Sequence, residues 1–389
     1  MKDSAMRWAV EKIGDAAGRG QELVPLWRSV TDVLCEVVPG IWDACWYTVD
    51  PASLLVTSHF RQGKADVPEV LLEELVFHEH FSDDVNRIVD ISRSASGIAA
   101  IHEANGGGPG ASTRWRRSLT VGSDQELRVS LRTRSKEAWG ALSLYREAGR
   151  PPFDTDVRTL LRTVAPRLAL AVRQAHLPIG AHDHGTADTP GLIVLDRGSK
   201  VRAASPGIER WLGRLPDGDW SAGRLPSAVL SVAATALRAA DREEGAVPAP
   251  LARVAGRSGG WLALHGVHLS TAGGAGTHEA AVVIEYAHPE RVLPLLMSAY
   301  GLTDRERDVV RLSLQGRSTA QIAEYLVVST HTVQQHLKSI FAKTGVRSRR
   351  DLVGTLFSGG AEPVPRQSSG GGSAGPEDSG VRTPPGAGT

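Results

Sequence analysis

Residues 302 to 357 constrain the fold more than any other stretch, because they contain the start signals of four short helices in close succession. A hydroxyl residue followed three positions later by Glu or Gln is typical of a capping box, in which two side chains satisfy two free backbone amides. Single Ser, Thr, Asp or Asn residues can also cap a helix start. The predicted caps are Thr303 with Glu306, Ser318 with Gln321, Ser329 alone, and Ser348 with Asp351.

The joint between the second and third of these helices is short. Only Val327 and Val328 separate Leu326 from the predicted cap at Ser329. A helix-turn-helix needs such a tight connection between its two helices. The sequence therefore predicts an all-α domain of four helices over residues 302–357, with a helix-turn-helix inside it.

The third helix is expected to have one apolar and one polar side. Its apolar positions follow at steps of four, three and four, so they share one face and should pack on the other helices. These positions are Val333, Leu337, Ile340 and Thr344. The opposite side carries His331, Gln334, Gln335, Lys338 and Ala342. Gln can form two hydrogen bonds with the edge of adenine, and Lys suits the O6 and N7 acceptors of guanine.

The charge of the segment fits a nucleic-acid partner. Residues 302–357 hold nine Lys or Arg against five Asp or Glu, whereas the whole chain sums to only +1. The remainder of the chain must therefore be net acidic. Positive charge concentrated beside a helix-turn-helix is the pattern expected for binding DNA phosphates.

On these residues the segment resembles the DNA-binding domain of LuxR/FixJ-type transcription regulators. Matching positions include Leu302, Thr303, Glu306, Gly316, Ile322, Ala323, Ser329, Val333, His336, Ile340, Lys343, Gly345 and Leu352. One position departs from the pattern: Thr344 stands where the family usually has Leu. Its hydroxyl could bond back to the carbonyl of Ile340.

The resemblance implies a set of residues at the DNA. Gln334, Gln335 and Lys338 are expected at base edges, and Thr332, His336 and Lys343 are expected to contact or approach the phosphate backbone. Ser329 and His331 complete the expected interface. The resemblance also implies that the fourth helix, residues 348–357, forms a dimer contact, so that two copies read a two-fold related site.

Composition and length set limits on the rest of the chain. Its 389 residues are enough for two or three domains, and 41% of them are hydrophobic. No apolar run is long enough to span a bilayer, and the charged N-terminus lacks the apolar centre of a secretory signal. Two cysteines, Cys35 and Cys45, cannot form a disulfide framework. We expect a cytoplasmic protein without a membrane partner.

Turn-forming stretches divide the chain. Residues 178–191 lack apolar periodicity and are expected to link two domains, and residues 359–389 lack apolar residues to bury and are expected to be disordered. The predicted units are a domain at 21–176, a second at 190–286, a connecting helix at 289–300, and the DNA-binding domain at 302–357. In the connecting helix, Val292, Leu295, Leu296 and Ala299 form one apolar stripe.

Both upstream domains show a mixture of strand and helix patterns, which indicates an α+β fold for each. The first, with Trp139-Gly140-Ala141-Leu142, Phe153-Asp154 and a closing helix, resembles a GAF-type sensor domain. The second opens with a strand, a turn at Arg197-Gly198 and another strand, followed by helices and late strands, and this order resembles a PAS fold. The chain is thus expected to be a multidomain protein with a GAF-like domain, a PAS-like domain, a helix-turn-helix domain and a disordered tail.

Sensor domains of these kinds bind small molecules between sheet and helices, or pair with a second copy. Five aromatic residues could line such a pocket or form ordinary core: Trp42, Trp46, Tyr47, Trp115 and Trp139. The triplets at 78–80 and 182–184 both read His-acid-His, but neither has the spacing of a metal site on one helix face. We expect no metal and no cofactor, with an unidentified small ligand left open.

These features together favour a DNA-binding transcriptional regulator, controlled by a ligand or a partner and acting as a homodimer on double-stranded DNA. RNA polymerase is a candidate further partner. The alternative is a sensing or adaptor protein whose C-terminal helices serve only for dimerisation. An enzyme is not expected, because the sequence contains no GxxxxGK[ST] phosphate loop and no Ser/His/Asp arrangement with supporting context.

Overall fold

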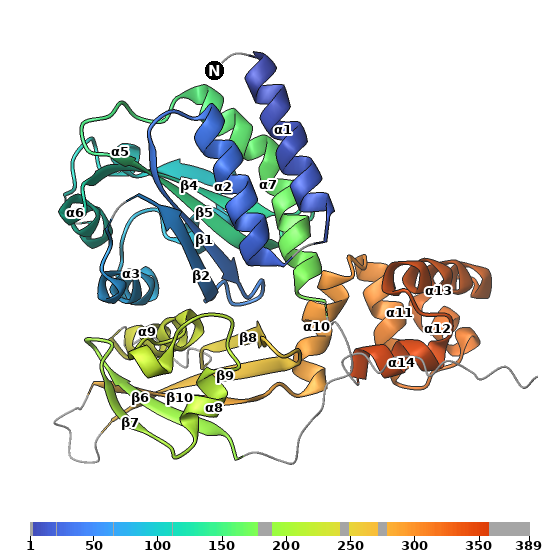
Figure 1. Ribbon diagram of the computed structural model, residues 1–389. Helices are drawn as coiled ribbons and strands as arrows, with labels where there is room; N and C mark the ends of the chain where they lie inside the picture. The colour runs from blue at the N-terminus through green and yellow to red at the C-terminus, as the bar shows by residue number, and fades with distance from the viewer. Residues whose placement is uncertain are drawn as a thin grey trace, which may run out of the picture.

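The computed structural model describes residues 3–20, 22–64, 66–110, 112–177, 189–241, 249–270 and 278–357 (Figure 1). Two antiparallel sheets, each with its own helices, precede a compact group of C-terminal helices. The predicted tail at 359–389 and most of the predicted linker at 178–191 lie outside the described residues. No described helix is long and apolar enough to cross a bilayer.

The first sheet has five strands in the order β2-β1-β5-β4-β3. The strands are β1 (Ile41–Val49), β2 (Val56–Gly63), β3 (Ile98–Ala100), β4 (Ser123–Arg132) and β5 (Ala138–Glu147). All neighbouring pairs are antiparallel, and Trp46 of β1 lies opposite both Phe60 of β2 and Leu142 of β5. The hairpins β1–β2 and β4–β5 therefore lie side by side, joined through the pairing of β1 with β5.

Helices cover both faces of this sheet. One layer consists of α1 (Asp3–Gly18), α2 (Leu23–Val37) and α7 (Thr155–Ala175), which pack along one another (Figure 1). The other elements are α3 (Glu69–Phe81), α4 (Ile88–Arg93), α5 (Ile101–Ala104) and α6 (Thr113–Thr120). Trp27 of α2 stacks on Trp46 of β1 with ring centroids 4.4 Å apart, and both rings are buried. The packed layer begins upstream of residue 21, where the sequence predicts the domain to start, because Ala9 and Ile13 of α1 are fully buried.

The second sheet repeats the same strand order, as β7-β6-β10-β9-β8. Its strands are β6 (Gly191–Asp196), β7 (Val201–Ala204), β8 (Leu251–Ala255), β9 (Trp261–Leu269) and β10 (Glu279–Tyr286). Two helices, α8 (Ile208–Leu212) and α9 (Ser227–Asp241), and the 3-10 turn at Trp220–Ala222 lie between β7 and β8. The strand–turn–strand opening at 191–204 is as predicted, and β6 and β7 pair as a hairpin.

The two sheet units face each other through α3 and α9 (Figure 1). Hydrogen bonds and ion pairs also join the two sheet units. Asp50 is buried and accepts hydrogen bonds from Nε and Nη2 of Arg253, each at 2.9 Å. Asp217 accepts from the backbone N–H of His59 at 2.9 Å, and burial raises the pKa of its carboxyl to about 6.

The C-terminal helices are α10 (Pro289–Ala299), α11 (Asp304–Leu314), α12 (Thr319–Leu326), α13 (Thr330–Thr344) and α14 (Arg349–Phe357). The apolar stripe of α10 is buried, as predicted, and α10 packs against α14. The predicted connecting helix thus packs on the C-terminal helices. Arg307 of α11 forms an ion pair with Glu137 of the first unit at 2.8 Å, which ties this group to the sheet above it.

Candidate nucleic-acid interface

Each helix of residues 302–357 starts where its cap signal predicts. Thr303 Oγ1 accepts from the N–H of Glu306 at 3.4 Å, and the Glu306 carboxylate accepts from the N–H of Thr303 at 2.7 Å. Ser318 and Gln321 form the same reciprocal pair. Ser329 Oγ accepts from the N–H of Thr332 at 3.0 Å. Ser348 caps the fourth helix by accepting from the N–H of Asp351 at 3.1 Å. The local hydrogen bonds that define the four helices were therefore legible in the sequence.

The joint of the helix-turn-helix is as short as predicted. The second helix ends at Leu326 and the third begins at Thr330, after the Ser329 cap. Val327 makes the reversal by adopting the left-handed conformation, with φ of 55°. A β-branched residue rarely occupies this region, because its Cβ crowds the backbone. The turn is therefore locally strained, and the side chain responsible is 89% exposed.

The inward face of α13 is the predicted one. Val333, Leu337, Ile340 and Thr344 are the buried residues of the helix. The hydroxyl of Thr344 donates to the Ile340 carbonyl at 2.8 Å, so the polar group that departs from the family pattern is satisfied inside the core. This local bond removes most of the cost of burying a hydroxyl.

The opposite face of α13 is open to solvent. Gln334, Gln335 and Lys338 are all exposed, and the Gln335 amide nitrogen lies 3.4 Å from Nε2 of His331. His336 and Thr332 are partly exposed beside them. Amide and ammonium groups that the protein does not cover are available to bond to base edges or phosphates.

One expected contact residue, Lys343, is already held by the protein. Its Nζ lies 2.6 Å from the Glu306 carboxylate and donates to the Gly301 carbonyl at 3.2 Å. Ser339 Oγ donates to the same carboxylate at 2.6 Å. Burial alone would raise the pKa of Glu306, but these donors together with Thr303 outweigh it and lower the pKa to about 2. Glu306 is thus both the capping residue of α11 and the acceptor that fixes the end of α13.

Nothing in the sequence indicates that Glu306 accepts from Lys343, because the two residues lie 37 positions apart. The same holds for Arg349, which donates to the Arg317 carbonyl at 2.6 Å and to Ser313 Oγ at 2.9 Å. These contacts link helix starts and ends that spacing alone cannot pair. The Glu306 contacts join α11 to α13, and the Arg349 contacts join α14 to the end of α11 and the residues after it.

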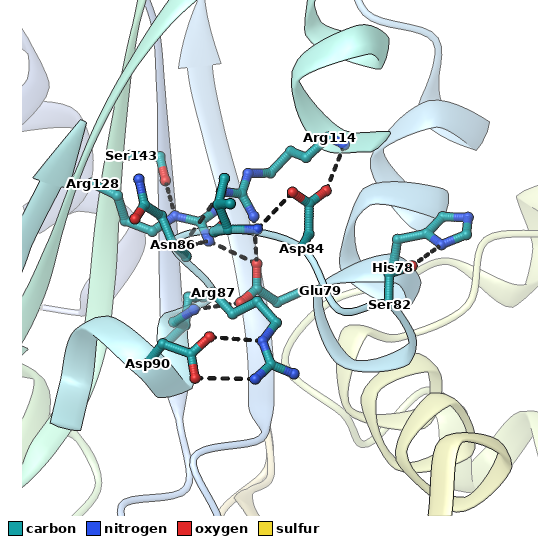
Figure 2. Close-up of polar contacts among 12 residues, drawn as sticks. His78, Glu79, Ser82, Asp84, Asn86, Arg87, Asp90, Arg114, Arg128 and Ser143 are labelled. Atoms are coloured by element: carbon teal, nitrogen blue, oxygen red, sulfur yellow. Dashed lines mark hydrogen bonds and ion pairs between the residues drawn. The ribbon is translucent and has the colours of Figure 1, made fainter. Parts of the chain in front are cut away.

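The first sheet unit has a second concentration of functional groups, a buried ionic cluster of Glu79, Glu126, Arg114 and Arg128 (Figure 2 shows three of them). Arg128 Nη1 donates to Glu79 at 2.7 Å, and Arg114 Nε donates to Glu126 at 3.0 Å. Arg128 also donates to Ser143 Oγ at 2.8 Å. Burial would raise the pKa of Glu126, but the two guanidinium groups outweigh it and lower that pKa. The charges pair with one another, so the cluster holds α3 and α6 to the sheet.

This arrangement leaves little room for a ligand between the sheet and α3. The cavity there measures about 30 Å³ and is lined by Trp42, Cys45, Leu72 and Tyr145 among others. Of the five aromatic residues considered for a pocket, Trp46, Tyr47, Trp115 and Trp139 are buried and do not line it. They serve as core at this site.

The His-acid-His triplet at 78–80 is also used internally. His78 Nδ1 bonds Ser82 Oγ at 2.8 Å, and His80 Nε2 accepts from the N–H of Val56 at 3.2 Å. Among the residues that the structure describes, no group of three potential ligands is placed to hold a metal ion. The second triplet, at 182–184, lies outside those residues.

Comparison with known proteins places the C-terminal group in a family. Residues 301–356 match the family described as bacterial regulatory proteins, luxR family. A Mycobacterium bovis protein named "Putative HTH-type transcriptional regulator Mb0914c" is 45% identical over 78 residues, which are 20% of this chain and 9% of that protein. The monoamine regulon transcriptional regulator of Klebsiella aerogenes is 41% identical over 61 residues, covering 16% of this chain and 27% of the relative. The chain therefore spans about a tenth of the length of the first relatives it matches.

Among solved structures, SdiA of Escherichia coli aligns with 92% of this chain and 97% of its own, at 11% identity and a TM-score of 0.33. The LuxR-family factor CepR2 of Burkholderia cenocepacia aligns with 43% of this chain and 93% of its own, at 15% identity and a TM-score of 0.32.

Proposed function

Because residues 301–356 form a LuxR-family helix-turn-helix domain, we propose that this chain is a transcriptional regulator that binds double-stranded DNA through α13. The supporting observation is the uncovered polar face of that helix, where Gln334, Gln335 and Lys338 are exposed beside a buried apolar face. An α-helix fits the major groove, where Gln pairs with adenine and Lys with guanine. In this proposal these three side chains read the bases.

The residues at the start and end of α13 hold the phosphate backbone in this proposal. Ser329 and Thr332 lie at the N-terminus of the helix, where backbone N–H groups and the helix dipole favour an anion. His331 and His336 lie within the next two turns. The side chain of Lys343 is one third exposed, and in this proposal the exposed part contacts phosphate while Glu306 fixes the position of Nζ.

We further propose that the regulator acts as a homodimer on a two-fold related site, in the cytoplasm, with RNA polymerase as a further partner. The upstream units act as GAF-like and PAS-like sensor domains. Their shared strand order and the way α3 meets α9 support two similar units that move as one body. The alternative, an adaptor whose C-terminal helices only dimerise, would leave the polar face of α13 without a role.

The test is to select a preferred duplex from a random-sequence library with the full chain, and then to measure affinity at several salt concentrations. We expect log affinity to fall steeply with log salt, because each phosphate contact releases counterions. Lys338→Ala should weaken the preferred duplex by roughly 5- to 150-fold and relax base preference at one position, corresponding to about 1–3 kcal/mol.

Lys12→Ala on α1 is the matched control, since it removes an exposed lysine far from α13 and should leave affinity unchanged. Weak binding that does not respond to salt would favour the adaptor. Uniform loss of affinity on all sequences in the Lys338 variant would contradict its base-reading role.

A further inference from the structure

A cavity of about 540 Å³ lies between the two sheet units, a size within the range of small-molecule sites. Its upper wall comes from the turn between α1 and α2, the last turn of α7, and strands β1 and β2. Its lower wall comes from β8, the residues that follow it, and Pro216. In Figure 1 these elements meet where the lower ends of α2 and α7 approach β8. Interfaces between domains are preferred places for ligand sites.

Three hydroxyl groups line the upper wall. Thr48 Oγ1 lies 2.7 Å from Thr57 Oγ1 and 2.7 Å from Ser58 Oγ. Three hydroxyl hydrogens serve only these two bonds, so one O–H hydrogen has no acceptor within the trio. Thr48 and Thr57 are almost fully buried, whereas Ser58 is half-buried, so the remaining hydrogen is available to an acceptor in the cavity that these residues line.

His176 supplies the complementary acceptor. The side chain is 8% exposed, and its Nδ1 lies 2.7 Å from the Val172 carbonyl. A carbonyl only accepts, so Nδ1 carries the hydrogen, and burial lowers the pKa of the ring below its usual value. In the neutral ring Nε2 is then the acceptor, and it has no hydrogen-bond partner among the described residues. Its neighbour Gln174 adds an amide at the rim.

The remaining lining indicates an uncharged occupant. Among the described residues that line the cavity, Glu22 and Arg257 are the only charged ones, and they are opposite in sign and both exposed. The rest of the wall is largely alanine, leucine and valine, for example Ala17, Leu26 and Val254. An ion would lose its hydration here without gaining a counter-charge inside the cavity.

We propose that this cavity binds a small neutral molecule with an apolar body, one hydrogen-bond donor for His176 Nε2 and one acceptor for the hydroxyl trio. Such a molecule would contact both sheet units at once. It would also lie beside Trp261, which stacks on His176 with centroids 6.0 Å apart and whose carbonyl accepts from Ala287, just before α10. Occupancy would thus fix the two units near the segment that leads to the helix-turn-helix domain.

The regulatory consequence rests on the proposed DNA-binding function, but the binding site does not, so the test uses no DNA. Benzamide, a neutral aromatic carboxamide with donor and acceptor, is titrated into the full chain and followed by saturation-transfer difference NMR. Benzoate and benzylammonium, which have similar shapes and a negative or positive charge, are titrated in parallel. We expect saturable benzamide binding in the millimolar range and at least tenfold weaker binding of both ions.

Two variants locate the site. Ala175→Leu should fill part of the cavity and abolish benzamide binding. Thr57→Val, which removes a hydroxyl at constant shape, should weaken binding about tenfold, whereas Thr159→Val on the exposed side of α7 should not change it. Circular dichroism of each variant confirms that it is folded before titration.

Absence of a saturable benzamide signal would overturn the proposal. Equal binding of benzoate or benzylammonium would refute the neutral class. Binding that survives Ala175→Leu in a folded variant would place the probe elsewhere. None of these results depends on whether the chain binds DNA, so a failure here is distinct from a failure of the proposed function.

Discussion

Replacing Glu306 by Gln should uncouple α11 from α13 and remove a pH-dependent part of the stability of the C-terminal helices. In the wild type, the carboxylate accepts from Lys343, Ser339 and the N–H of Thr303. A neutral amide cannot form the ion pair and brings a donor where three donors already converge. The loss should therefore exceed that of an ordinary surface substitution.

The size of the effect follows from the pKa. Folding lowers the pKa of Glu306 from 4.5 to about 2, and each unit corresponds to about 1.36 kcal/mol. The upper bound is roughly 3 kcal/mol. Because one third of Lys343 is exposed and screened by solvent, we expect about 2 kcal/mol at pH 7.

The direction in which the stability changes with pH follows from the same pKa shift. A carboxyl whose pKa is lowered by folding stabilises the fold fully above its unfolded pKa, here near pH 4.5, and loses this contribution as pH falls towards 2. The difference between wild type and Glu306→Gln should thus be constant from pH 7 to about 5 and should shrink by more than half at pH 3.

Hydrogen exchange measured by mass spectrometry on the full chain is suited to this test, because the C-terminal helices contain no tryptophan. Protection of peptides from α11 and α13 should fall roughly 30-fold at pH 7 in the variant, the equivalent of about 2 kcal/mol. Asp304→Asn, which changes an exposed acid in the same first turn, should alter protection by less than about 0.5 kcal/mol. A loss in Glu306→Gln that is the same at pH 7 and pH 3 would show that the charge of the carboxylate is not responsible.

Three further outcomes are expected in the same measurement. Val327→Asn should raise the stability of the helix-turn-helix by about 1 kcal/mol, because Asn tolerates the left-handed conformation better than a β-branched residue. The exposed Val327 side chain makes no packing contact that the substitution would remove. Lower protection of α12 in the variant would contradict this prediction. Thr344→Leu should also stabilise by roughly 1 kcal/mol, since it replaces a self-bonded hydroxyl with apolar volume, and a decrease would mean that the pocket cannot accept the larger side chain. Burial raises the pKa of Asp217 to about 6, so its contribution to the contact between the sheet units is present below pH 3.8 and is lost as pH rises through 6. Protection of β2 should fall over that range in wild type, and Asp217→Asn should remove the dependence.

The helix-turn-helix domain was predictable almost residue by residue, because the interactions that define it are short in sequence. A capping box joins positions three apart, and the inward face of α13 repeats every three or four residues. The same holds for the β6–β7 hairpin that opens the second unit, whose strands follow one another directly. Thr344 could even be assigned its bond to Ile340, since a hydroxyl in a helix reaches the carbonyl four positions earlier.

Elements without a strong local pattern were not predicted. These are the edge strands β3 and β8, which are three and five residues long and each pair with only one neighbouring strand. A proline inside a helix is expected to kink or break it, yet α7 runs without a break from Thr155 to Ala175 with Pro166 inside it. Packing against α1 and the sheet offsets the hydrogen bond that the proline removes and the clash of its ring with the preceding turn.

The chain's sequence by itself determined where helices start, which side of α13 is apolar, and which polar side chains lie on the opposite side. Only the tertiary structure decided that Lys343 is held by Glu306, that paired Arg and Glu side chains are buried between the first sheet and helices α3 and α6, and that an open cavity lies beside His176. The physical reason is distance along the chain. Bonds across three or four residues follow from local geometry, whereas groups brought together from 37 or more positions apart depend on the path of the whole backbone.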